Sequence, residues 1–182
     1  WLLFDAGQLR LARGGIQSRV RWPAYSLGFV SRDAYLRQHL NYYDSAHYCN
    51  ENLGLGEKAL LVGEHRKMHW RCAVEGSDWF DVERILPFLR EARDADGLVD
   101  GLLAAGFTHL FLNLEEWGWP GPDGRQEGPA WAYNRRFLED RDVMLIQALL
   151  DSPRLPTVHA TLPGRIFVAR LEAASPGDFR GK

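Results

Sequence analysis

Apolar residues recur along the middle of the chain with the period and run lengths that distinguish strands from helices. A short apolar run at 58–63, closed by a glycine and charged residues, is typical of a buried parallel strand. The run at 107–114 is richer in β-forming residues and apolar enough to be central in a sheet. Residues 70–74 predict a further short strand.

Other segments follow the 3.6-residue period of amphipathic helices. Residues 32–53 predict one long helix that begins after the N-cap Ser31 and ends near Gly54. Residues 131–150 predict a second long helix, which the following prolines end. The pattern therefore predicts two long helices, one before the first strand and one after the central strand.

Shorter elements complete the pattern. We expect a helix that Asp81 caps and that runs to residue 89, and another over residues 96–105. Residues 115–129 are predicted to form a polar loop, rich in glycine and proline. Residues 157–160 and 165–171 predict a closing hairpin.

This order of elements predicts an α/β fold. We expect a small open Rossmann-like sheet, mostly parallel with a closing antiparallel hairpin, and helices on its faces. The chain divides into a basic membrane-proximal strap at 1–30, a single α/β domain at 31–172 and a flexible tail at 173–182. The length of 182 residues suits one domain with a sizeable core.

The charge balance narrows the function classes. A formal net charge of −2 argues against a nucleic-acid partner that needs an overall basic surface. The sequence contains no dinucleotide fingerprint and no phosphate-binding loop, so we expect no cofactor. It also lacks the G-x-S-x-G elbow of serine hydrolases. We therefore predict no catalytic residue within this chain.

Arginines are concentrated near the start of the chain. Four of them fit a position beside an anionic lipid surface, and these membrane-proximal candidates are Arg10, Arg13, Arg19 and Arg21. A solvated loop with scattered arginines is the alternative. The apolar opening stops at Asp5 and is far shorter than a membrane span. A membrane segment that ends just before the first residue is compatible with this pattern.

Polar residues that follow the predicted strands are candidates for ligand or partner contacts. In open α/β sheets ligands bind at the carboxyl ends of strands. Glu64 and His65 follow the first strand, whereas Asn113, Glu115 and Glu116 end or follow the central one. The two adjacent glutamates are interpreted either as a pair for acid–base chemistry or, preferably, as solvated loop acids.

Two further groups have open interpretations. Trp117 and Trp119 either stack on a sugar ring or lie at a lipid headgroup, or else they cover the core. His65, His69 and Cys72 are the one metal-like cluster, but a position between two strands disfavours tetrahedral geometry, so we expect no metal.

Cysteines are too few for a disulfide scaffold. Cys49 and Cys72 are the two in the chain. We favour separate buried thiols, with one bridge as the alternative if their Cα atoms are close enough.

Four sequence stretches together resemble a known protein family. They read LGFVSRDAYLRQHL at 27–40, YCNENL at 48–53, ALLVGEH at 59–65 and GFTHLFLN at 106–113, with a looser match at 166–171. They resemble the soluble C-terminal region of bacterial polytopic membrane glycosyltransferases of the dolichyl-phosphate-mannose mannosyltransferase type. In that family the catalytic acid lies among the membrane helices, so the resemblance carries no catalytic residue onto this chain.

The resemblance implies a membrane-associated domain on the extracytoplasmic face, either periplasmic or outer. Its partners would be the membrane part of the same polypeptide and, in addition, an anionic lipid surface or a glycan acceptor. The arginines of the strap favour the cytoplasmic side by the positive-inside rule, against this placement.

Three functional hypotheses follow. The leading one is a non-catalytic soluble accessory domain of a membrane-bound glycosyltransferase that uses lipid-linked sugar donors. The first alternative is a free-standing small α/β enzyme or sugar-binding module that uses the strand ends. It predicts a concave pocket there with at least one perturbed carboxylate, lined by Glu64, His65, Asn113, Glu115 and Glu116. The second alternative is a cell-envelope protein-interaction domain, with an apolar patch formed by Trp1, Leu3, Trp22 and Phe29.

Overall fold

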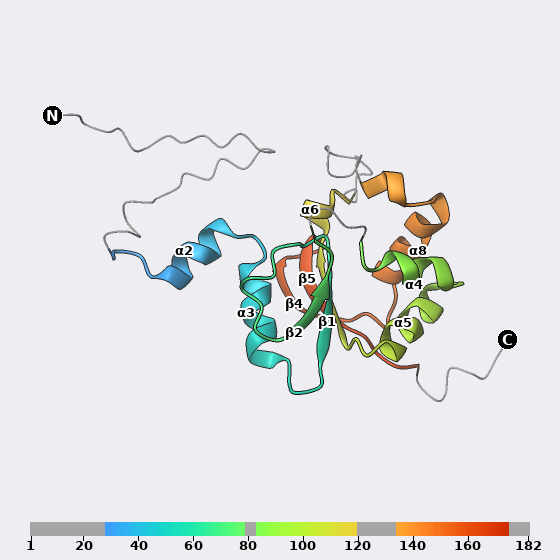
Figure 1. The fold of residues 1–182 in the computed structure, drawn as a ribbon, viewed down its shortest axis with the longest axis horizontal. Helices are drawn as coiled ribbons and strands as arrows, with labels where there is room; N and C mark the ends of the chain where they lie inside the picture. The colour runs from blue at the N-terminus through green and yellow to red at the C-terminus, as the bar shows by residue number, and fades with distance from the viewer. Residues whose placement is uncertain (1–27, 79–82, 120–133, 175–182) are drawn as a thin grey trace.

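The computed structural model describes residues 28–78, 83–119 and 134–174. These residues form a five-stranded sheet with the strand order β2-β1-β3-β5-β4, with helices packed on both faces (Figure 1). The strap residues 1–27, the tail residues 175–182, most of the predicted polar loop and the predicted cap Asp81 lie outside the described residues.

The sheet has a parallel core and an antiparallel edge. The strand β1 (Lys58–Val62) pairs in parallel with both β2 (Ala73–Gly76) and the central β3 (His109–Asn113). The hairpin of β4 (Thr157–Leu162) and β5 (Ile166–Arg170) adds to β3 in antiparallel orientation. The predicted fold class, an α/β sheet with a closing antiparallel hairpin, is therefore confirmed.

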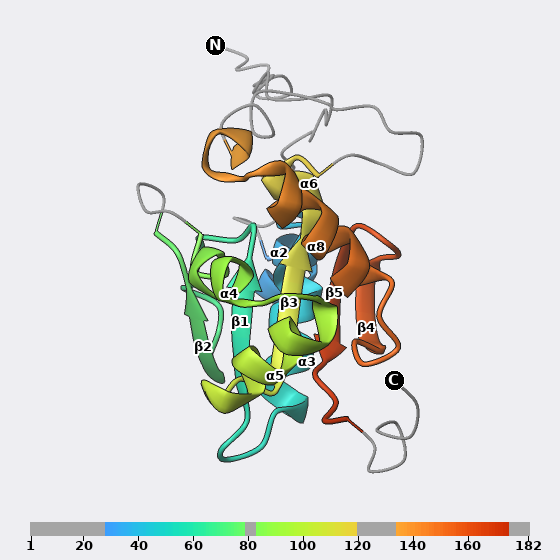
Figure 2. The ribbon, with the colours of Figure 1, turned by 90° about the vertical axis from the view of Figure 1, so that its right-hand side faces the viewer.

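One face of the sheet carries the larger hydrophobic core. The helices α4 (Leu86–Glu91), α5 (Ala95–Ala104) and α8 (Asp140–Leu150) cover it, and they are in front of the sheet in Figure 2. Their apolar stripes meet alternate side chains of β1 and β3, such as Leu60 and Leu110, which are fully buried. Burial of these apolar surfaces is the main stabilising contribution to the layer.

The helix α3 (Tyr43–Asn52) covers the opposite face. A second apolar cluster fills the space between them and consists of Tyr42, Ala46, Cys49, Leu61, Trp70, Phe111, Ile166 and Val168. Because side chains alternate along a strand, neighbouring residues of β3 belong to different clusters. This arrangement explains why all five residues of β3 are buried.

The predicted long helix at 32–53 is wrong as a single element. The chain forms α2 (Arg32–His39) and α3, separated by an extended residue, Leu40, with φ −121° and ψ 107°. The break lets Tyr42 turn into the core, where 1% of its surface is exposed. By contrast, α2 buries none of its residues.

The second predicted long helix is also shorter. Residues 131–133 lie outside the described residues, and a single 3₁₀ turn (Arg135–Phe137) precedes α8. Leu138 is extended between them, and Glu139 accepts a hydrogen bond from the backbone of α8 in a capping box with Asp142. A cap of this kind fixes the start of a helix, so the break has a local cause.

Smaller differences concern element ends. The helix α5 begins at Ala95, after the N-cap Asp94 and one residue earlier than predicted, and β2 begins at Ala73, so Trp70 is a buried loop residue. The start of the predicted polar loop contains a short helix, α6 (Leu114–Trp117). In the part of the chain that the structure describes, every helix is too short or too polar to cross a membrane.

Candidate functional site

The carboxyl ends of β1 and β3 lie side by side at one edge of the sheet. After β1 the chain runs toward the face of α3, where Trp70 joins the second cluster. After β3 it enters α6, where Leu114 and Trp117 belong to the larger core on the opposite face. Connections that diverge to opposite faces mark a topological switch point, the place where ligands bind in open α/β sheets.

Gly63 brings these two strand ends together. Its φ of 72° lies in the left-handed region. A Cβ atom at this position would overlap the carbonyl oxygen of Asn113 and lie 2.8 Å from the Cβ of Trp117. Only glycine therefore allows the close approach, which turns the residues after β1 across the end of β3.

An ion pair between Glu64 and Arg66 is at the centre of the site. Oε1 of Glu64 accepts hydrogen bonds from the Arg66 backbone N–H (2.9 Å) and from Nε (2.7 Å), and Oε2 accepts one from a terminal guanidinium nitrogen (2.8 Å). The Glu64 side chain is 1% exposed and that of Arg66 is 25% exposed. A buried carboxylate needs such paired, charge-assisted bonds to remain ionised.

Three further side chains complete the network around this pair. Asn113 donates to Oε2 of Glu64 at 3.1 Å and accepts from the backbone N–H of Glu116, which caps α6. The guanidinium of Arg66 reaches both Asn41 (3.1 Å) and the Glu116 carboxylate (3.3 Å). The network therefore ties the ends of β1 and β3 to the break between α2 and α3.

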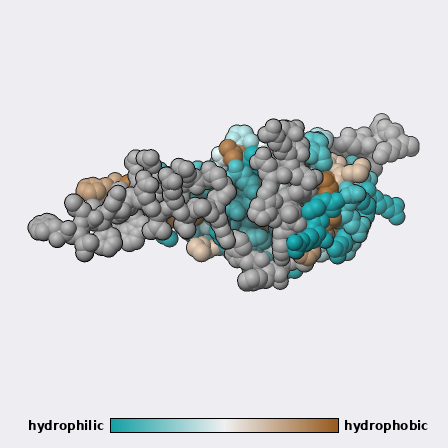
Figure 3. Space-filling view, turned by 90° about the horizontal axis from the view of Figure 1, so that it is seen from above, coloured by the Kyte–Doolittle hydropathy of each residue, from teal (hydrophilic) through white to brown (hydrophobic). Residues whose placement is uncertain are grey.

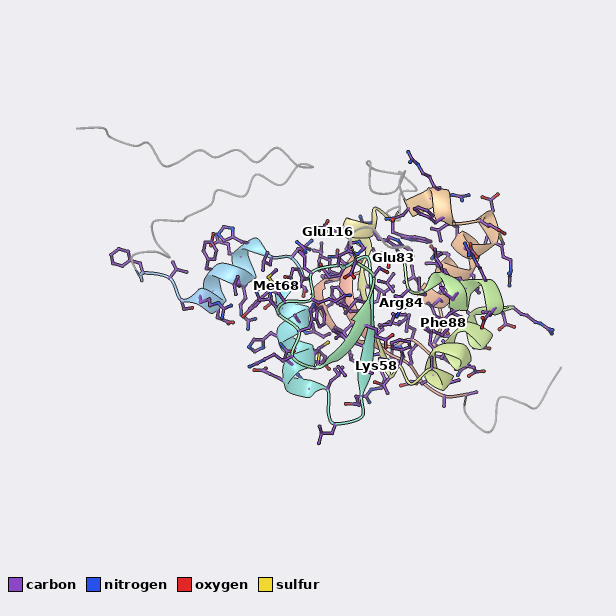
Figure 4. All side chains as sticks on the ribbon, viewed as in Figure 1. Lys58, Met68, Glu83, Arg84, Phe88 and Glu116 are labelled. Carbon is purple, nitrogen blue, oxygen red and sulfur yellow. The ribbon has the colours of Figure 1, made fainter. Side chains whose placement is uncertain are left out.

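Glu83 is a second buried carboxylate at the same edge. Its Oε1 accepts from the backbone N–H of Gly63 at 3.3 Å, and its Oε2 accepts from the hydroxyl of Ser77 at 3.3 Å. Burial raises the pKa of Glu83, and the nearby Glu64 carboxylate raises it further, although His65 opposes the shift. Figure 4 labels Glu83 and Glu116 at the same end of the sheet.

The aromatic ring of Tyr42 packs against the guanidinium of Arg66. The ring of Tyr42 lies 4.4 Å from the guanidinium carbon, a cation–π distance. The hydroxyl of Tyr42 is hydrogen-bonded to Nδ1 of His69 at 2.7 Å. Burial raises the pKa of Tyr42 to about 12, with the Glu64 charge adding to the effect. Burial also lowers the pKa of His69, so this histidine is neutral at pH 7.

The structure brings together three of the residues that the sequence singled out, Glu64, Asn113 and Glu116. His65 borders the site, where its Nδ1 lies 3.3 Å from the backbone oxygen of Ser77. Glu115 is half-buried on α6 and takes no part in the described hydrogen bonds of this network. Of the two adjacent glutamates, Glu116 pairs with Arg66 and is 45% exposed, and their use as an acid–base pair stays the less favoured prediction.

Of the alternatives for the two tryptophans, the structure favours the one in which they cover the hydrophobic core. Trp117 and Trp119 are 1% and 6% exposed, and their rings stack on each other at 5.5 Å. Both belong to the larger hydrophobic core, so the expectation that they stack on a sugar or lie at lipid headgroups is wrong. Their position directly after Asn113 explains this burial, because α6 folds back over the end of β3.

The residues of the metal-like cluster have other contacts. His69 bonds to Tyr42, His65 lies against Ser77 and Cys72 packs beside Cys49. Among the described residues, no group of three metal-ligating side chains is close enough to hold an ion. The arginines at 10, 13, 19 and 21 lie outside the described residues.

Five residues of the site were not predicted: Asn41, Tyr42, Arg66, Ser77 and Glu83. Asn41 and Tyr42 fell inside a predicted helix, and Glu83 in a second one, where polar positions usually face solvent. The one local signal was Arg66, which lies two residues after Glu64 and has the opposite charge.

Comparison with protein-family models, curated proteins and solved structures finds no match for this chain. The chemistry of the site must come from its own residues. All four oxygens of the two buried carboxylates accept hydrogen bonds from protein groups. The polar groups that face outward are the guanidinium of Arg66 and the carboxylate of Glu116, which is 45% exposed.

Proposed function

We propose that this chain is a non-catalytic accessory domain of a membrane-bound glycosyltransferase that uses lipid-linked sugar donors. It lies on the extracytoplasmic face and contacts the membrane part of the same polypeptide. The sequence resemblance motivates this proposal, and the geometry of the carboxyl edge supports its non-catalytic part.

The observation that carries the proposal is the hydrogen bonding of the two buried carboxylates, Glu64 and Glu83. A general acid or base must direct a carboxylate oxygen toward a reacting proton. Glu64 instead accepts hydrogen bonds from Arg66 and Asn113. Glu83 accepts them from the backbone N–H of Gly63 and the hydroxyl of Ser77. These hydrogen bonds connect separate loops to one another, as expected for carboxylates with a structural role.

The position of α2 fits a contact with another part of the polypeptide. This helix buries none of its residues and lies beside α3, away from the sheet (Figure 1). Just before it, Phe29 is 80% exposed. A polar helix on the outside of the fold leaves room for a contact with another part of the polypeptide, whereas a single exposed apolar side chain is common on protein surfaces.

Vesicle binding tests the lipid contact of this proposal. The 182-residue chain is sedimented with vesicles of anionic phospholipid, and with zwitterionic vesicles as a reference. We expect binding to the anionic vesicles that weakens as salt is added. Replacing the strap arginines Arg10, Arg13, Arg19 and Arg21 by glutamine should abolish it.

A matched variant controls for net charge. Arg84, Arg90, Arg93 and Arg136 are exposed on the described part of the domain, and their replacement by glutamine removes the same charge. This variant should bind like the wild type. Absence of binding at low salt, or equal losses in the two variants, would refute a specific contact through the strap.

A sugar-binding module is the second candidate, and a specific observation favours it. Arg66, Glu116 and Asn41 lie together at the switch point, and planar charged and amide groups of this kind recognise sugar hydroxyls. Glu83, whose pKa burial raises, lies at the same edge, although it is not among the strand-end residues that this hypothesis named. Chemical-shift changes at these residues on titration with monosaccharides would support it, and unchanged spectra would exclude it.

The interaction-domain hypothesis rests on an apolar patch, of which only Phe29 lies within the described residues. Its exposure agrees with such a patch, but Trp1, Leu3 and Trp22 lie outside the described residues. Seen from above, the described surface is largely hydrophilic, with scattered apolar side chains (Figure 3). This view therefore gives the interaction-domain hypothesis no support beyond Phe29.

A further inference from the structure

The side chains of the two cysteines lie on the face of the sheet that α3 covers. Cys49 lies on α3 and is completely buried in the second hydrophobic cluster. Cys72 immediately precedes β2, is half-buried and packs against that cluster. Each thiol shifts the pKa of the other, so the two side chains lie close together although 22 residues separate them in the sequence.

Asn50 holds the two segments in register beside the thiols. Its amide oxygen accepts from the backbone N–H groups of Arg71 (2.5 Å) and Cys72 (3.0 Å). Its amide nitrogen donates to the carbonyl of His69 at 2.8 Å. Three hydrogen bonds of the residue next to Cys49 therefore fix the backbone of His69, Arg71 and Cys72. Such a clamp lowers the entropic cost of closing a bond between the two sulfurs.

We propose that Cys49 and Cys72 are a dithiol modification site that a small-molecule or protein disulfide oxidises to an intramolecular disulfide. The bond would connect α3 covalently to the β1–β2 connection, the segment that carries Arg66 and His69. This inference is independent of the proposed glycosyltransferase role.

The chemistry follows thiol–disulfide exchange. The Cys72 thiolate attacks one sulfur of the oxidant, such as glutathione disulfide, and releases one glutathione thiolate. Cys49 then loses its proton, and its thiolate attacks the Cys72 sulfur and releases the second glutathione. Two cysteine thiols are oxidised and one glutathione disulfide is reduced to two thiols.

The environment assigns the order of these steps. The contact with Cys49 lowers the pKa of Cys72, whereas that same contact and burial raise the pKa of Cys49. Cys72 is also the more exposed of the two. Because the thiolate is the nucleophile, Cys72 reacts first with an external disulfide and Cys49 resolves the mixed disulfide.

Redox equilibration of the 182-residue chain tests the proposal. The reduced chain is incubated with buffers of reduced and oxidised glutathione, quenched with acid, and analysed by intact mass and peptide mapping. We expect an intramolecular disulfide, identified by the loss of two hydrogen masses and a Cys49–Cys72 cross-linked peptide. Its equilibrium constant should be on the order of a hundred-fold larger in the native chain than in urea, as expected for a closed loop of about 24 residues.

Two variants make the outcome specific. Asn50→Ala removes the clamp and should lower the native equilibrium constant while leaving the constant in urea unchanged. Cys72→Ser should form no intramolecular bond and only slowly take up glutathione at Cys49. Accumulation of glutathionylated Cys72 in the wild type, or equal constants in native buffer and urea, would overturn the proposal.

Discussion

The buried pair of Glu64 and Arg66 allows one prediction to be worked out in detail. Replacing Arg66 by methionine keeps the length of the side chain but removes its hydrogen bonds to Oε1 and Oε2 of Glu64. The backbone N–H of residue 66 and the amide of Asn113 remain as donors. Glu64, with its side chain 1% exposed, is then left without a cation beside it.

Removing one partner of a buried ion pair costs about 3–5 kcal/mol, because the other charge stays desolvated. The remaining donors place Arg66→Met near the lower end, at about 3 kcal/mol. The double variant Glu64→Gln with Arg66→Met removes both charges and should recover most of this loss. A positive coupling energy between the two sites is therefore expected.

Urea unfolding followed by far-ultraviolet circular dichroism measures these free energies. Wild type, both single variants and the double variant form one cycle, and Arg93→Met at an exposed position is the control. The slope of the unfolding free energy against urea should stay constant across the set. A loss below about 1 kcal/mol for Arg66→Met, or a double variant as unstable as that single one, would refute the reasoning.

Three further predictions concern the same edge of the sheet. Gly63→Ala should destabilise the fold by more than about 2 kcal/mol, since it adds overlap with the end of β3 to left-handed strain. At Gly56 φ is 91°, but an added Cβ would meet open space. Gly56→Ala should therefore lower the free energy of unfolding, measured in urea, by only about 1 kcal/mol. The raised pKa of Glu83 means that the native state holds its proton more tightly than the unfolded state, so this residue's contribution to stability is lost as pH rises from about 4.5 through the raised pKa. Glu83→Gln should flatten that fall in urea midpoints, and an unchanged pH profile would contradict it. Spectrophotometric titration of the tyrosines should lose a component with a pKa of about 12 in Tyr42→Phe, and persistence of that component would show a wrong assignment.

The sequence predicts the sheet better than the helices around it, for a physical reason. The strands at 58–62 and 109–113 are continuous apolar runs because both of their faces are buried, and this signal is local. The helix breaks depend on contacts made elsewhere. Tyr42 interrupts the first helix because its ring packs against Trp70 and beneath Arg66, residues that follow the next strand.

The same distinction applies to the candidate site. The strand-end rule places Glu64 and Asn113 together because it needs only the ends of two parallel strands. It does not place Glu83, which reaches the end of β1 through the turn at Gly63, or Asn41, which depends on the helix break. Trp117 is buried because α6 folds back over β3, which a loop rich in glycine and proline does not indicate.

Sugar transfer from a lipid-linked donor distinguishes a non-catalytic accessory domain from an enzyme. We propose that this chain is part of a longer polypeptide, and that polypeptide and the isolated 182-residue chain are compared with a polyprenyl-phosphate-linked sugar as donor. We expect transfer by the complete polypeptide, none by the isolated chain, and full activity for the complete polypeptide with Glu83→Gln. Turnover by the isolated chain that is lost in a folded Glu83→Gln variant would contradict it.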